Sequence, residues 1–198
     1  MNIISNDCTA GFIYRELNQR YGNPFIWTSI DLDNFIKLVE NYDTIDFSNI
    51  TGIKLIENNS KISVQNEMCP VIRIDDLIDV YYFHHFYKKG VNEELNTTKR
   101  YIYDEHISEY LLESYRRRLC NMTDSPMFIW SDHDSYKWYK SDLSRFKNIR
   151  TKYRIIIYTH KEVSFDNPNI LVVKKAHNDA LIEKNAISLS SIFKKIII

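Results

Sequence analysis

The sequence predicts an α/β fold, a single domain in which a mostly parallel or mixed sheet carries helices on both faces. Three observations predict this fold. Short apolar runs recur along the chain, amphipathic helical patterns separate many of them, and several runs end in polar clusters. Strands that alternate with helices are typical of parallel sheets. A chain of 198 residues with 44% hydrophobic content suffices for one core, so we expect one domain over 1–198.

The first predicted strand and helix meet at a cysteine. Residues 2–5 have the pattern of a short buried strand, 6–8 form a polar turn, and a helix is expected from 9 to about 19. At such a junction the helix dipole and free backbone N–H groups can lower the pKa of Cys8 or bind an anion. Cysteine is also a common core residue that stays inert when nothing activates it. The turn is therefore a candidate site, with a buried structural thiol as the alternative.

Turn residues and apolar spacing predict the remaining elements of the N-terminal half. These are a strand or extended segment at 25–28, a helix at 32–41 capped by Asp31, a hairpin with arms at 53–56 and 61–64, and strands at 70–74 and 78–83. The last strand runs into a pair of histidines.

The C-terminal half is predicted by the same patterns. Its elements are an exposed loop at 88–104, a helix at 107–119, a strand at 127–130, a helix at 136–146, and strands at 153–158 and 169–173. We expect the apolar and basic segment 189–198 to pack on the domain.

Charge and cysteine content restrict the partners and the compartment. Lys plus Arg and Asp plus Glu number 26 each, so nucleic acid is not an expected partner. Apolar runs are shorter than the roughly 18 residues of a spanning helix, and the N-terminus lacks a leader pattern. Cys8, Cys69 and Cys120 are odd in number and lack metal or redox spacing. We therefore expect a soluble cytoplasmic protein with reduced thiols and no transmembrane segment.

Polar clusters follow four of the predicted strands, and ligands of α/β sheets bind beyond the carboxyl ends of strands. The clusters are Asn6-Asp7-Cys8, His84-His85, Ser131-Asp132-His133-Asp134 and Thr159-His160. If the strands are parallel, Cys8 as nucleophile, His85 as its base and Asp132 as the orienting carboxylate form a catalytic set for acyl transfer or hydrolysis. The side chain of Asn6, or the backbone N–H groups after Cys8, would bind the oxyanion.

Each member of this set has a structural alternative. His85 lies between aromatic residues and fits a hydrogen-bonded core histidine, and Asp132 fits a cap for the following helix. A metal site at residues 132–134 is disfavoured because the spacing matches no typical metal motif.

Several segments resemble one known bacterial family. They are Ile3 to Tyr14, Tyr21, Asn23 to Phe25, Asp33 to Leu38, Pro70-Val71, Asp75-Asp76, Phe83 to Phe86, Arg116 to Arg118 and the strand at Phe128. In their order along the chain they are similar to domain of unknown function 1919, and the N-terminal segment matches without a gap. Members of that family are often labelled exopolysaccharide or capsular polysaccharide biosynthesis proteins, so the resemblance implies a pathway more firmly than a reaction.

The resemblance and the polar clusters together support three hypotheses, none of which identifies a cofactor. The first is an enzyme that transfers or removes a group on an activated sugar or its acyl donor, with Cys8 as nucleophile. Asn6, Asp7, Arg117, His133 and His160 are its candidate substrate-binding residues, Arg117 for a phosphate or carboxylate. A solvated helix end is the alternative for the arginine run. The second hypothesis is a nucleotide-sugar glycosyltransferase, and the third is a saccharide-binding or scaffold subunit.

Overall fold

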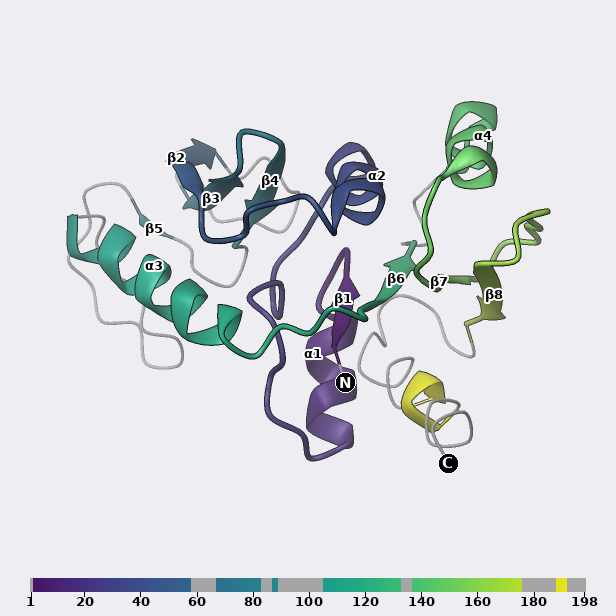
Figure 1. Cartoon of the computed structure of the whole chain (residues 1–198), viewed down its shortest axis with the longest axis horizontal. Coiled ribbons are helices and arrows are strands. Elements are labelled where there is room, and N and C mark those ends of the chain that lie inside the picture. The colour runs from purple at the N-terminus through teal and green to yellow at the C-terminus, as the bar shows by residue number, and fades with distance from the viewer. Residues whose placement is uncertain are drawn as a thin grey trace.

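The structure, a computed structural model, describes residues 2–57, 67–82, 87–88, 105–132, 137–175 and 188–191 (Figure 1). Its elements are β1 (Ile3–Ser5), α1 (Thr9–Glu16), α2 (Leu32–Asn41), β2 (Ile50–Glu57), β3 (Glu67–Ile74), β4 (Ile78–Tyr81), β5 (Tyr87–Lys88), α3 (Glu105–Leu119), β6 (Met127–Ser131), α4 (Lys140–Asn148), β7 (Ile155–Thr159) and β8 (Ile170–Lys174). A further helical turn covers 188–191.

Four strands form a parallel sheet in the order β1-β6-β7-β8. Each is a short run of mostly β-branched and aromatic residues, and β6 and β7 are buried along almost their whole length, as expected for strands covered on both faces. This sheet confirms the α/β fold class.

Helices cover both faces of the parallel sheet. Side chains alternate along each strand, so each face presents apolar residues to the helices on its side. On one face Ile3, Ile129 and Ile156 pack with Ile13 of α1 and with Leu189. On the other face α2 and α4 supply aromatic rings. In Figure 1, α1 and the turn at 188–191 lie below the sheet, and α2 and α4 lie above it.

Aromatic side chains fill the space between the sheet, α2 and α4. The Phe35 ring of α2 lies 5.2 Å from that of Trp130 and 6.1 Å from that of Phe128, measured between centroids. Phe146 of α4 lies 5.9 Å from Trp130. Edge-to-face contacts at these distances add to the stabilisation from burial.

A second, antiparallel sheet contains β2, β3 and β4, with β5 paired to β3. The sequence predicted these strands as part of one sheet. Tight connections such as the turn at 75–77, where Asp75 and Asp76 adopt φ near +50°, favour pairing between sequence neighbours instead. The buried cluster nevertheless continues from one sheet to the other, because Ile72 and Val80 share it with Phe128.

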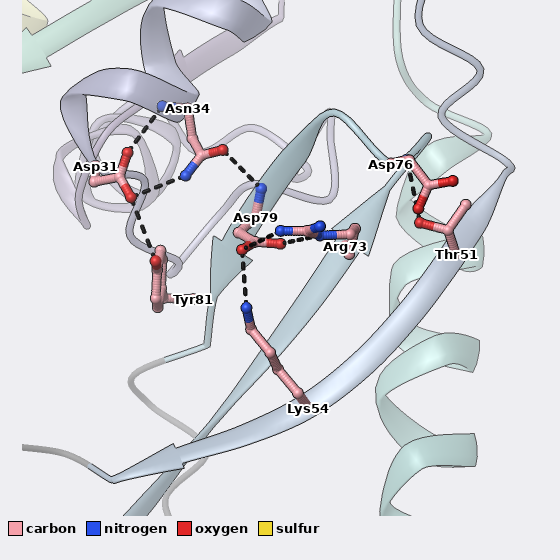
Figure 2. A network of polar contacts seen from close by, with 8 residues as sticks. All are labelled: Asp31, Asn34, Thr51, Lys54, Arg73, Asp76, Asp79 and Tyr81. Atoms are coloured by element: carbon pink, nitrogen blue, oxygen red, sulfur yellow. Dashed lines mark hydrogen bonds and ion pairs between the residues drawn. The ribbon is translucent and has the colours of Figure 1, made fainter.

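Hydrogen bonds attach the start of α2 to β4 (Figure 2). Asp31 caps the helix by accepting from the backbone N–H of Asn34 at 2.8 Å, as the sequence predicted. The Asn34 side chain accepts from the backbone N–H of Asp79 at 3.0 Å. The Asp79 carboxylate in turn accepts two bonds from Arg73, at 2.8 and 3.0 Å, and one from Lys54 at 3.0 Å.

Two further elements differ from the prediction. Residues 24–27 form a turn rather than a strand, and Trp27 within it has a φ of 62°. The indole of Trp27 lies on Gly11 of α1, so closely that a β-carbon at Gly11 would meet it at 2.7 Å. The helix expected at 136–146 begins at Lys140. The hairpin arm at 61–64 lies outside the described residues, as does the loop at 88–104 except for Lys88 of β5.

Candidate functional site

The carboxyl ends of the parallel strands bring polar residues of three predicted clusters to one edge. Residues 6–8 follow β1, 131–132 end β6 and 159–160 end β7. Between β1 and β6, the following helices α1 and α4 lie on opposite faces of the sheet. This split between the two helices lies at the carboxyl ends of the strands, where ligands of α/β sheets bind. We call the residues 5–8 and 131–132 the β1–β6 edge.

Asn6 joins the two strands across this split. Its side-chain NH₂ donates to the backbone oxygen of Ser131 at 3.0 Å, and its side-chain oxygen accepts from the backbone N–H of Ser131 at 2.7 Å. The Asn6 side chain is buried. The Asn6 amide therefore bridges the ends of β1 and β6, and its contact with an oxyanion stays a prediction.

The first backbone N–H groups of α1 are also occupied. Asp7 Oδ1 accepts from the N–H of Thr9 at 2.9 Å, and Ser5 Oγ accepts from the N–H of Ala10 at 3.0 Å. These groups were the predicted anion-binding donors after Cys8. Two of them are satisfied within the turn, and the neighbouring Asp7 carboxylate adds negative charge. The turn is therefore better suited to a hydrogen-bond donor than to an anion.

Asp7 carries an unsatisfied oxygen. The residue is 7% exposed, and Oδ2 has no hydrogen-bond partner among the residues that the structure describes. Leaving a buried carboxylate oxygen without a donor costs free energy, so native structures rarely do so without a reason. A ligand hydroxyl or amine would supply the missing donor.

Cys8 lies half-buried at the start of α1. Burial raises the pKa of its thiol to about 12, and the charge of Asp7 acts in the same direction. The predicted lowering of the pKa by the helix end is therefore wrong. Desolvation and a neighbouring carboxylate outweigh the helix dipole, and the resting thiol is neutral at pH 7.

Asp132 is held by three side chains at the end of β6. Its Oδ2 accepts from the indole N–H of Trp138 at 2.8 Å and from the hydroxyl of Thr159 at 2.5 Å. Its Oδ1 lies 3.5 Å from the ammonium of Lys175, which also donates to the backbone oxygen of Asp132. The side chains of Asp132 and Lys175 are 2% and 3% exposed. This geometry fixes the ends of β6, β7 and β8 relative to one another.

Lys175 also lies at the carboxyl ends of the parallel strands, and the sequence analysis did not select it as a site residue. It directly follows β8, so the rule that selected the other polar clusters would have selected it too. A lysine after an exposed strand reads as a solvated side chain, and only the fold shows that this one is buried against Asp132.

Of the four remaining predicted site residues, one lies at this edge, one lies in α3 and two lie outside the described residues. His160 follows β7 at the same edge and is half-buried. Arg117 of α3 is exposed, whereas the neighbouring Arg118 donates to the backbone oxygen of Ile26 at 3.1 Å. His85 and His133 lie outside the described residues, so their predicted roles beside Cys8 and Asp132 stay predictions.

The described residues define an α/β protein with a candidate ligand site at a split in its parallel sheet. The chain belongs to the family of Domain of unknown function (DUF1919), whose model matches residues 1–108. The match includes Asp7 and Cys8 and ends before the arginines of α3. A search of curated proteins found no match.

The described residues contain no group of three or more His, Cys, Asp or Glu side chains placed to hold a metal ion. None of the described helices has the length and apolar character needed to cross a membrane.

Proposed function

We propose that this protein is an enzyme of bacterial exopolysaccharide or capsular polysaccharide biosynthesis that transfers or removes a group on an activated sugar or acyl donor. The observation that carries the proposal is the buried Asp7 Oδ2, which lacks a donor among the described residues at the β1–β6 edge. A sugar hydroxyl supplies such a donor, and a carboxylate that binds it can also accept its proton. The resemblance of the N-terminal segment to proteins labelled for polysaccharide biosynthesis supports the pathway.

In the covalent form of this proposal, Cys8 is the nucleophile. Its thiol gives its proton to the Asp7 carboxylate as Sγ bonds to the acyl carbon of the donor, and the leaving group departs with the electrons of the broken bond and takes that proton. A sugar hydroxyl then attacks the thioester carbon, the Asp7 carboxylate accepts its proton, and that proton passes to Sγ as the sulfur leaves. The raised pKa of Cys8 is consistent with a thiol that stays neutral until a base acts on it.

A glycosyltransferase that binds its metal through Asp132 receives less support. Both carboxylate oxygens of Asp132 already face donors, Lys175 on one side and Trp138 with Thr159 on the other. A metal ion would have to displace these side chains from a buried position.

The test is complementation of a strain from which the gene has been deleted. Full-length wild-type, Asp7→Asn, Cys8→Ser and the control Asp166→Asn proteins are expressed at equal levels, and extracellular polysaccharide is measured. Asp166 is exposed and lies outside the β1–β6 edge, so its variant should restore synthesis. Asp7→Asn should not, and full synthesis with this variant would refute the proposal. Full synthesis with Cys8→Ser would refute only the covalent form.

A stability measurement separates loss of function from loss of fold. Asn at position 7 keeps an oxygen for the N–H of Thr9 and removes a buried charge that lacks a donor among the described residues. Asp7→Asn should therefore unfold at the same temperature as the wild type or at a higher one. A large decrease would mean that Oδ2 has a structural partner.

A further inference from the structure

A cavity of about 280 Å³ lies between the C-terminal ends of α2 and α3. Its apolar wall consists of Tyr42, Ile45 and Phe47 after α2, with Leu119 and Met122 at the end of α3. Neither Asp7 nor Cys8 lines it. We call it the α2–α3 cavity.

Two exposed carboxylates, Asp43 and Asp124, also line the α2–α3 cavity. Asp43 accepts a hydrogen bond from the hydroxyl of Tyr153 and pairs with Lys152 at 2.9 Å, so its charge is partly compensated. Asp124 makes no hydrogen bond or ion pair with any residue that the structure describes. The lining therefore keeps net negative charge.

The environment of Tyr42 reports this negative charge inside the cavity. Burial is the main reason why the pKa of its hydroxyl is raised to about 12, and the charges of Asp124 and Asp43 act in the same direction. The C-terminal end of α2, which carries no basic residue in its last turn, adds the negative end of a helix dipole.

We propose that the α2–α3 cavity binds a small primary ammonium ligand, with its alkyl part against Phe47, Leu119 and Met122 and its ammonium group at Asp124 and Asp43. An apolar wall beside carboxylates matches the two parts of an alkylammonium ion, a methylene chain and a strongly hydrated charge. A neutral ligand of the same shape gains only the apolar contact, and an anion meets two carboxylates. This site is separate from the β1–β6 edge, so it stands or falls independently of the proposed function.

The probe pair is n-pentylammonium and 1-pentanol, which share the alkyl chain and differ in charge. Each is titrated at neutral pH into the full-length ¹⁵N-labelled protein, and binding is followed by amide chemical shifts. Pentylammonium should give saturable shifts confined to 42–47 and 119–124, with pentanol weaker by about fivefold or more. Salt at about 0.5 M should weaken only the binding of the amine.

Variants locate the charge that matters. Asp124→Asn should weaken pentylammonium binding by about fivefold, and Asp124→Lys should abolish it. Since Asp124 is exposed and makes no described hydrogen bond, neither change should affect folding. The control Asp166→Asn lies outside the cavity and should bind as the wild type does. Equal binding of pentanol, unchanged binding by Asp124→Asn, or shifts centred elsewhere would each overturn the proposal.

Discussion

The buried ion pair between Lys175 and Asp132 leads to a prediction about stability. Replacing Lys175 with Met keeps most of the side-chain volume and removes the charge. At 3.5 Å between Nζ and Oδ1, the attraction is about 5 kcal/mol at an effective dielectric constant of about 20. Burial of both groups offsets much of this, but removing one partner leaves the other charge buried, which costs about 3 kcal/mol. We therefore expect Lys175→Met to lower the free energy of unfolding by about 3 kcal/mol.

The neighbouring lysine provides a matched control. Lys174 pairs with Glu162 at 2.7 Å, but both side chains are largely exposed, so Lys174→Met should leave stability within experimental error. Urea unfolding followed by circular dichroism measures both variants, with the midpoint lowered and the slope unchanged for Lys175→Met. In the double variant with Asp132→Asn, the two effects should fall short of additivity by about 2 kcal/mol. Equal midpoints for the two lysine variants would refute the reasoning.

Three further predictions concern packing, pH and reactivity. Gly11→Ala forces a β-carbon into the indole ring of Trp27 and should lower the free energy of unfolding, measured in urea, by about 1–3 kcal/mol. The control Gly52→Ala, whose β-carbon would lie 3.8 Å from its nearest neighbour, should change stability less. A larger loss of stability in Gly52→Ala than in Gly11→Ala would contradict this packing. Hydrogen bonding from Arg73 holds the pKa of Asp79 below its value in the unfolded chain. The contribution of Asp79 to the free energy of unfolding is therefore fully present above the unfolded pKa and is lost as pH falls through the folded pKa. Asp79→Asn should therefore remove part of the acid dependence of the urea midpoint, and an unchanged profile would show that the pair does not contribute. Iodoacetamide at neutral pH should modify the exposed Cys120 faster than Cys8, because the pKa of the Cys8 thiol is raised. Mass spectrometry measures the two rates of modification. Faster labelling of Cys8 than of Cys120 would indicate an activated thiol.

Local patterns predicted most of the elements because the signals lie within a few residues of one another. The helix at 32–41 has both a capping Asp31 and an apolar stripe, and its observed bounds match the prediction. The turn at 24–27 was missed because its left-handed Trp27 depends on contact with Gly11 of another element.

The candidate site was predictable in position and not in chemistry. Polar residues after β1, β6 and β7 converge because parallel strands end at the same edge. Which of them remains available depends on partners distant in sequence. Asn6 bonds to Ser131, 125 residues away, and Asp132 is paired with Lys175, 43 residues away.

The sequence by itself determined the α/β class and most of the helices and strands, because strand and helix periodicity and helix caps are local. Only the tertiary structure decided that β2, β3 and β4 form a separate sheet, that Arg118 rather than Arg117 contacts the body of the protein, and that the thiol of Cys8 is neutral. These outcomes depend on long-range pairing and on desolvation, which exist only once the chain has folded.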